Sequence, residues 1–484
     1  SGGAIMSWKL VPDDTTVVAN SSQNNVMHGL GFSTSSPAIA RVDTNSGTPK
    51  DLLFIGGGLS TSALDASLAP SYTSPSITKF GRSLIAFDVV NGPGTSLYTW
   101  NFNDSAFTTK FGSMGCIPAA TVPTDLVPGR GRAWRVYFSD TPTDANATAT
   151  TPRGAGVWAL GDTALFQTTD GASVGNVIRE DSSNIDVWAG GATVNTTAGI
   201  RHILQTPTGY SITTPPAVFL LGNPSVYPAF RSAAPKTAPA TVALAFGTGD
   251  RNDPTDQDSI DPGSANQNYL DVIFDRNDSG SLSGVAKVVT TNLDTAGMSQ
   301  STDLADLTSV SSLTDTNIVG APYYLTQYLG YKLKMGAATA QPTSGKFYYP
   351  KVITSATVLN GVLFFSDFLP GQGNSSACTG TGTTNTYRIC DVMRPVFNGG
   401  NTVASSTTFN SGSASCSGIV LTFPNLPGEI TSLGTTSIIQ TGQGTSSTGG
   451  GDSNTINNTG ANVGSGSANP NARTFKPRAW RVVR

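Results

Sequence analysis

A short acidic loop carries the residues best suited to bind a metal ion. It follows an apolar run and has oxygen donors at alternate positions, which are Asp275, Asn277, Ser279, Ser281 (through its backbone carbonyl) and Ser283. An EF-hand-like loop places ligands at these positions and a glycine at position 6, which is Gly280 here. The pattern predicts a calcium ion held on a hairpin between two strands.

The same loop is poor in negative charge. Asp275 is the only carboxylate at a standard ligand position, and Ala286 stands where an EF-hand has its bidentate Glu. Fewer carboxylates weaken binding, so we expect an affinity of about 10⁻⁴–10⁻³ M, as in extracellular calcium modules. The alternative is a plain turn, because Asn, Asp, Ser and Gly are also the residues that tight turns use.

Two further segments gather oxygen donors. Asp43–Asp51 has them at alternating positions, but its glycine comes one place early and Pro49 stiffens it, which favours a hairpin turn. The segment 250–261 contains five aspartates. It is interpreted as a solvated loop between strands, with distant ligation of the calcium loop as the alternative.

Histidines and cysteines limit the other chemistry. Only His28 and His202 occur, without an HExxH or GxSxG motif, so neither zinc hydrolysis nor a serine triad has its usual residues. There are four cysteines, which are Cys116, Cys378, Cys390 and Cys416. We expect a disulfide between Cys378 and Cys390, with the other two paired or reduced, and four reduced thiols as the alternative.

The composition favours a protein outside the cell. Charged residues are 12% of the 484 residues, about half of the usual share. The net charge of −3 comes without a basic stripe, which argues against nucleic acid as a partner. No apolar run is long enough to span a membrane. The chain starts at Ser1 without a signal sequence, and we interpret it as a processed or truncated product.

Short apolar runs between Gly, Pro, Asn and Asp turns predict an all-β protein that positions these loops. A unit of three strands recurs after Pro37, Pro118, Pro216 and Pro350 with growing spacing. Such a unit suits the blade of a β-propeller with long loop insertions, and unrelated β-domains are the alternative. A short helix is expected over Ser301–Thr308. Residues 431–473, rich in Gly, Ser, Thr and Asn, are predicted to form a surface loop or linker before the closing segment.

Several phrases resemble the C-terminal domain of PilY-type proteins, in the family's order. They are GFSTSSPAI (Gly31–Ile39), VALAFGTGDR (Val242–Arg251), STDLADLT (Ser301–Thr308), ATVLNGVLFF (Ala356–Phe365) and the closing AWRVVR (Ala479–Arg484). The family closes on Ser-Trp-Arg, and this chain has Ala479 in place of that serine. The resemblance implies a single domain over residues 1–484, folded as a modified propeller of about seven irregular blades.

The resemblance also implies a function. It points to a non-enzymatic component of the type IV pilus tip that supports pilus assembly, surface adhesion and twitching motility. Minor pilins would be its partners, the surface receptor is not specified, and the location would be the pilus tip or bacterial surface, reached through the periplasm. It also implies a calcium loop after the Gly-Thr-Gly-Asp phrase, where the family carries Asp at two positions that are Ser279 and Ser283 here. A carbohydrate-binding or surface-layer propeller and a quinoprotein-like dehydrogenase are the alternatives.

Overall fold

Strands dominate the computed structural model, whose described residues form 26 strands and three short helices. The predicted all-β class is confirmed. None of the described helices has the length and hydropathy needed to cross a bilayer. The structure describes residues 30–31, 35–60, 80–102, 105–125, 131–142, 154–161, 166–167, 177–178, 183–191, 194–195, 197–220, 242–251, 268–275, 297–306, 330–335, 339–340, 347–359, 362–370, 382–389, 418–424, 427–433, 436–441 and 453–457.

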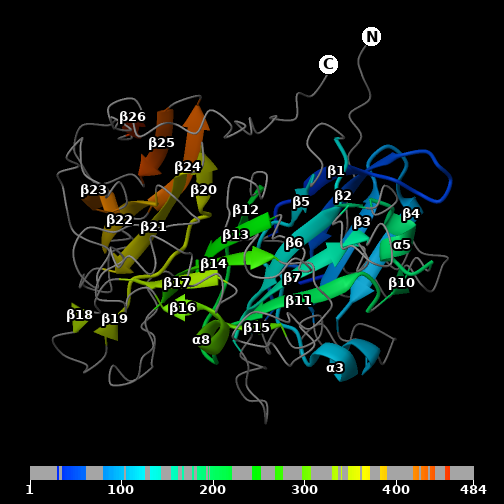
Figure 1. The fold of residues 1–484 in the computed structure, drawn as a ribbon, viewed down its shortest axis with the longest axis horizontal. Helices are drawn as coiled ribbons and strands as arrows, with labels where there is room; N and C mark the ends of the chain where they lie inside the picture. Colours follow the sequence, from blue (N-terminus) through cyan, green and yellow to red (C-terminus); the bar gives the residue numbers. More distant parts are fainter. Residues whose placement is uncertain are drawn as a thin grey trace.

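Four sheets of four or five strands follow one another along the chain (Figure 1). Sheet 1 contains β1 (Ala38–Val42), β2 (Lys50–Gly56), β3 (Ser83–Asp88), β4 (Gly92–Asn101) and β10 (Val194–Asn195). Sheet 2 contains, from its inner edge, β5 (Val122–Thr124), β6 (Arg135–Asp140), β7 (Gly156–Gly161), β11 (Ile200–Gln205) and β15 (Met298–Ser299). Sheet 3 contains β12 (Ala217–Leu220), β13 (Val242–Gly247), β14 (Tyr269–Asp275), β17 (Gly330–Lys334) and β16 (Ala305–Asp306). Sheet 4 contains β20 (Thr357–Leu359), β21 (Val362–Pro370), β22 (Gly382–Ile389) and β23 (Gly418–Pro424).

Smaller elements complete the described chain. Three small sheets are formed by β8 (Phe166–Gln167) with β9 (Val177–Ile178), by β18 (Thr339–Ala340) with β19 (Phe347–Tyr348), and by β24 (Pro427–Leu433), β25 (Thr436–Thr441) and β26 (Ser453–Asn457). The helices are α3 (Ser105–Phe111), α5 (Ile185–Trp188) and α8 (Gln300–Asp303). β25 and β26 lie inside the segment 431–473 that was predicted as a loop or linker, so its described part is a sheet instead.

Burial explains why the central strands have near-continuous apolar sequences. The first strands alternate, and β2 buries every second residue in the manner of a strand with one covered face. By contrast β3, β6, β7, β13 and β14 are buried at every position. A strand covered on both faces must be apolar on both, so these three sheets are covered on both faces at their central strands.

Neighbouring sheets do share their cores in chain order. One hydrophobic cluster joins sheets 1 and 2, a second joins sheets 2 and 3, and a third joins sheets 3 and 4. β14 shows the alternation, since Leu270, Val272 and Phe274 face sheet 4 and Ile273 faces sheet 2. Successive positions of one strand thus belong to two different cores.

The first strands of the four sheets meet in series. β1 contacts β5, β5 contacts β12, and β12 contacts β20. Figure 1 shows the sheets passing across the molecule, from β1–β4 on the right to β20–β23 on the left. Meander sheets that stack face to face with their first strands in contact have the arrangement of consecutive propeller blades. No sheet among the described residues is closed on itself, and the count of about seven blades stays a prediction.

Loops of one sheet also cover the outer edge of the sheet before it. β10 comes from the segment between β7 and β11 of sheet 2, yet it pairs in parallel with β4 of sheet 1. In the same way β15, from the segment between β14 and β17, pairs in parallel with β11 of sheet 2. These exchanged strands link adjacent sheets at their outer edges and protect edges that would otherwise present open backbone groups.

Three local predictions need correction. The first strands of the second and fourth units begin later than Pro118 and Pro350, because the residues at Ile117 and Lys351 form single bridges to Gly58 and Phe368 and the ladders start afterwards. The helix predicted over Ser301–Thr308 is one turn, Gln300–Asp303, followed at once by β16. A short capped segment can form a helix or a strand. Here its second half pairs with β17 and becomes a strand.

Candidate functional site

The predicted calcium loop begins where β14 ends. Asp275 is the last residue of that strand and is 1% exposed. The other four predicted ligands, Asn277, Ser279, Ser281 and Ser283, lie outside the described residues. The structure therefore places one of the five, and it places that one in the core between sheets 2 and 3.

Both carboxylate oxygens of Asp275 already have donors from sheet 2. Arg135 Nη1 and the hydroxyl of Tyr137 lie 2.6 Å from Oδ2, and Arg201 Nη2 donates to Oδ1. Arg135 and Tyr137 stand two apart on β6 and therefore point to the same face. Arg201 comes from β11 of the same sheet. The result is a buried cluster of one acid and two cations, which we call the Asp275 cluster.

The charges in this cluster support each other. Burial alone would raise the pKa of Asp275, but the guanidinium groups of Arg201 and Arg135 hold that pKa below its ordinary value. Burial would lower the pKa of Arg135, and the charge of Asp275 overrides it and keeps that pKa above the ordinary one. Burial raises the pKa of Tyr137, so its hydroxyl stays a donor. All three groups are therefore fixed in the protonation states that bind each other.

This arrangement does not fit a calcium site at Asp275. A calcium ion needs carboxylate oxygens that are free to coordinate it. Here both oxygens are engaged, and the two guanidinium groups beside them would repel a dication. Among the described residues, no group of three or more His, Cys, Asp or Glu side chains could hold a metal ion. Asp275 is better suited to join sheets 2 and 3.

A second carboxylate lies on the same face of β14. Asp271 is fully buried, and its Oδ2 accepts a 2.5 Å hydrogen bond from Gln300 Nε2 of α8. Lys332 stands opposite it on β17, and its ammonium group donates to the backbone oxygen of Gln300 at 3.2 Å. Burial raises the pKa of Asp271 to about 7, although Gln300 and Lys332 act in the opposite direction.

A third type of buried aspartate ties neighbouring strands of one sheet. In sheet 2, Asp140 at the end of β6 accepts from the Trp158 indole and from the Gly156 amide of β7, both at 2.7 Å. Asp140 pairs with Gly156 in the ladder, and Phe138 pairs with Trp158. The aromatic donor therefore stands two residues beyond the partner of the aspartate.

Sheet 4 repeats this geometry in the same register. Asp367 of β21 pairs with Asn385 in the ladder, and its carboxylate accepts a hydrogen bond from the backbone N–H of Asn385 at 3.2 Å. The hydroxyl of Tyr387 donates to the same carboxylate at 2.7 Å. Burial raises the pKa of Asp367 to about 6, with Tyr387 and Asn385 opposing it. We call this unit the aspartate–aromatic pair. Its sequence signal is Phe-Ser-Asp on the second strand and an aromatic residue on the third.

Sheet 3 departs from this repeat at the position that holds Asp271. Phe246 pairs with Asp271, in the register where Phe138 pairs with Trp158. An acid thus replaces the aromatic donor, and Thr248 stands at the place of the aspartate. The sequence analysis did not single out Asp271. Aligning the second and third strands of sheets 2 and 3 by their registers shows that it takes the position of Trp158.

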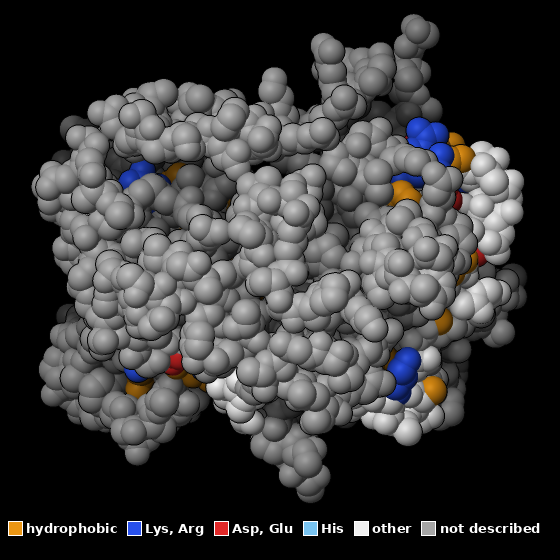
Figure 2. Space-filling model, viewed as in Figure 1, with side chains coloured by type: hydrophobic (Ala, Val, Ile, Leu, Met, Phe, Trp, Pro, Cys, Tyr) orange, Lys and Arg blue, Asp and Glu red, His pale blue; other side chains and the backbone are white. Residues whose placement is uncertain are grey.

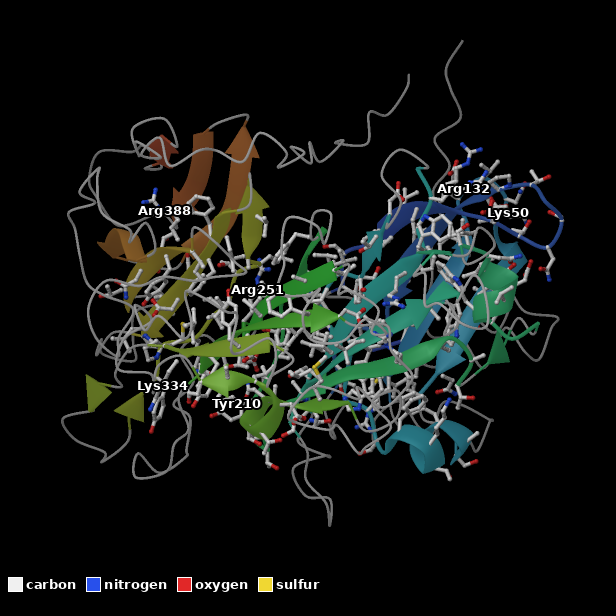
Figure 3. All side chains as sticks on the ribbon, viewed as in Figure 1. Lys50, Arg132, Tyr210, Arg251, Lys334 and Arg388 are labelled. Atoms are coloured by element: carbon white, nitrogen blue, oxygen red, sulfur yellow. The ribbon has the colours of Figure 1, made fainter. Side chains whose placement is uncertain are left out.

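The other acidic segments behave as turns where they are described. Asp43 accepts from Arg132 Nη1 and from the Ser183 hydroxyl, and Asn45 accepts from the Asn184 amide group. These contacts fasten the hairpin between β1 and β2 to the start of α5, at the right-hand side of Figure 3 where Arg132 and Lys50 are labelled. The hairpin interpretation of Asp43–Asp51 is confirmed. Most of the segment 250–261 lies outside the described residues.

The histidine and cysteine predictions are only partly covered. His202 is buried and stacks on Trp158, with ring centroids 4.0 Å apart, and its Nε2 lies 3.1 Å from the Leu204 carbonyl oxygen. It is a core residue. Cys116 is buried 3.4 Å from the Phe80 carbonyl oxygen. His28 and the other three cysteines lie outside the described residues, so the Cys378–Cys390 disulfide stays a prediction.

On one face of the molecule, the described Lys and Arg side chains do not form a continuous basic band. On the face drawn in Figure 2, described Lys and Arg side chains lie at separate places, next to hydrophobic or acidic ones.

Comparisons with known proteins found a similarity to a solved structure. No family model matches the chain, and no curated protein sequence matches it. Among solved structures it is similar to the C-terminal domain of PilY1 from Pseudomonas aeruginosa. The two share 14% sequence identity, the superposition covers 85% of this chain and 71% of that one, and the TM-score is 0.42.

Proposed function

We propose that the chain is a non-enzymatic component of the type IV pilus tip, which supports pilus assembly, adhesion to surfaces and twitching motility. Its partners would be minor pilins, and its location the pilus tip outside a bacterial cell. The observation that carries this proposal is the ordered set of PilY-type phrases from Gly31 to the closing Ala479–Arg484. That set spans most of the chain.

The packing supports the proposal because it gives two of these phrases a common physical role. Val242–Arg251 forms β13 and the turn after it, and Ala356–Phe365 includes β20 and the start of β21. Each phrase contributes to the second strand of its sheet, which is β13 in sheet 3 and β21 in sheet 4. At Gly247 a Cβ atom would lie 2.1 Å from the Val352 side chain, so the phrase needs a glycine where sheet 3 meets the chain entering sheet 4.

The proposal does not include calcium at Asp275, since the carboxylate is engaged by two arginines. Contact with minor pilins is proposed through added strands, because extracellular β-proteins commonly bind partners at sheet edges. The chain already uses this mode internally, where β10 and β15 add to neighbouring sheets.

The test is genetic and uses the bacterium that encodes the chain. Deleting the gene should reduce surface pili and the twitching zone, and the wild-type gene should restore both. Immunogold labelling should place the protein at pilus tips. Unchanged piliation and twitching in the deletion strain, with label away from pili, would overturn the proposal. Specific binding of the purified protein to defined glycans in that case would favour the carbohydrate-binding alternative.

A further inference from the structure

A nine-residue segment connects the outer edges of sheets 2 and 3. This segment, Met298–Asp306, begins as β15 in parallel with β11 of sheet 2. It continues as the single turn α8 and ends as β16, in parallel with β17 of sheet 3. We call it the strap. Each end has only two ladder residues, so the strap depends on what holds its middle.

The middle of the strap is held by two side chains of sheet 3. Gln300, the first residue of α8, is 1% exposed. Its side-chain amide donates to Asp271, and its backbone oxygen accepts from Lys332. Asp271 and Lys332 are cross-strand neighbours on β14 and β17. Sheet 3 therefore holds Gln300 through hydrogen bonds to both its side chain and its backbone.

This grip leaves Asp271 incompletely satisfied. Its Oδ1 is buried and has no hydrogen-bond partner among the described residues. Lys332 uses its ammonium group on Gln300 and over the Tyr269 ring, 5.2 Å from the centroid. A neutral carboxyl group tolerates such a site, whereas a buried carboxylate with one amide donor pays a large desolvation cost.

The surrounding charges can be named from each packed element. β17 contributes Lys332, β16 contributes Asp306 opposite it, and β14 contributes Tyr269. α8 contributes Asp303, whose carboxylate accepts from the Ser299 amide. On the side of sheet 2, His202 of β11 packs against Gly297 just before the strap. Among the described residues, Lys332 is therefore the cation that lowers the pKa of Asp271, and Asp306 acts in the opposite direction.

We propose that the strap is a pH-dependent clasp, which is docked while Asp271 is neutral and is released when Asp271 ionises. Oδ1 is buried without a partner among the described residues in the docked state, and release of the strap would let water reach it. Burial raises the pKa of Asp271 to about 7, so the docked form prevails below neutral pH. As the pH rises through about 7, the folded chain loses the proton and the docked form loses its advantage.

Hydrogen–deuterium exchange of the whole purified chain tests this clasp. Exchange of peptides covering 298–306, corrected for the intrinsic pH dependence of amide exchange, is followed from pH 5 to pH 9. We expect protection to fall at least tenfold around pH 7 in the wild type and to stay constant in Asp271→Asn. Asp367→Asn is the matched control, since it changes a buried aspartate in another sheet and should leave the transition of the strap unchanged.

A second variant covers the case in which Asp271→Asn does not fold. Lys332→Met removes the cation that lowers the pKa of Asp271, so the midpoint of strap release should move to higher pH. A role in packing alone would loosen the strap at every pH without moving the midpoint. Constant protection of the strap in the wild type, or an unmoved midpoint in Lys332→Met, would overturn the proposal.

Discussion

Asp271 and Asp275 lie on the same face of β14, about 13 Å apart at 3.3 Å per residue. Both are buried, yet their pKa values shift in opposite directions. Asp275 meets two guanidinium groups and a phenol from the neighbouring sheet. Asp271 meets one amide, and the nearest cation bonds elsewhere. Burial is common to both residues, so the difference in pKa comes from the number of charged donors that reach each carboxylate.

The comparison assigns different tasks to the two residues. The Asp275 cluster is a permanent connection between sheets 2 and 3, because the lowered pKa of Asp275 keeps its carboxylate ionised beside the two arginines over the whole neutral range. The Asp271 site is a conditional connection between the same two sheets, because its charge changes near pH 7. One strand, β14, thus carries a connection that does not depend on pH near neutrality and one that does.

Disrupting the Asp275 cluster should have the largest effect on the free energy of unfolding. Asp275→Ala takes the carboxylate away from Arg135 and Arg201, and breaking a buried pair costs roughly 3–5 kcal/mol of unfolding free energy. Urea unfolding followed by tryptophan fluorescence measures this loss. Asp51→Ala, at an exposed position of β2, is the control and should change stability by less than about 0.5 kcal/mol. A loss below about 1 kcal/mol for Asp275→Ala would contradict the account.

The Asp271 site should affect stability in a pH-dependent way. The pKa of Asp271 is raised on folding, so its contribution to stability is complete below about pH 4 and is lost as the pH rises through about 7. At pH 8, Asp271→Asn should therefore have an unfolding free energy up to about 4 kcal/mol higher than the wild type, and it should unfold at a higher urea concentration. At pH 4 the two should agree closely. Equal stability differences at both pH values would refute this reading.

The aspartate–aromatic pair of sheet 4 should give a smaller change. Tyr387→Phe removes the hydroxyl that donates to Asp367, at a cost of about 1–2 kcal/mol. Since the pKa of Asp367 is about 6, the cost should be larger at pH 8, where the carboxylate needs the donor, than at pH 5. Repeating the substitution in an Asp367→Asn background should abolish this pH dependence, and its persistence would exclude the pair as the cause.

Calcium should have the smallest effect. With Asp275 engaged by two arginines, we expect the melting temperature to be the same in several millimolar calcium and in excess chelator. Differential scanning fluorimetry measures it, with magnesium as the matched dication. A calcium-specific rise that disappears in Asp275→Asn would restore the calcium loop, since binding stabilises only through affinity for the folded state.

The strands could be predicted from the sequence better than the site could. Apolar runs such as Val242–Phe246 reveal doubly covered strands, and turn residues mark their ends. The loop pattern at Asp275 was visible, but its partners were not, because Arg135 and Arg201 are 140 and 74 residues away. Local spacing describes what a loop offers to an ion, and only packing shows that the first ligand points inward.

The aspartate–aromatic pair lies between these cases. Phe-Ser-Asp at Phe138–Asp140 and Phe365–Asp367 is visible in the sequence as a repeat. Its meaning depends on the register with β7 and β22, which fixes the aromatic donor two residues beyond the partner of the aspartate. The exception in sheet 3, where Asp271 takes the position of the donor, becomes apparent once the registers are aligned.

A carbon-13 NMR titration of the aspartate side-chain carboxyl groups tests the central comparison most directly. Asp271→Asn and Asp275→Asn spectra assign the two signals in the labelled wild-type chain. The account predicts that the signal of Asp271 titrates near pH 7, while that of Asp275 keeps the ionised shift down to the acid limit of folding. Both signals titrating together near pH 4 would contradict it, because the two sites would then not differ in the charges that reach them.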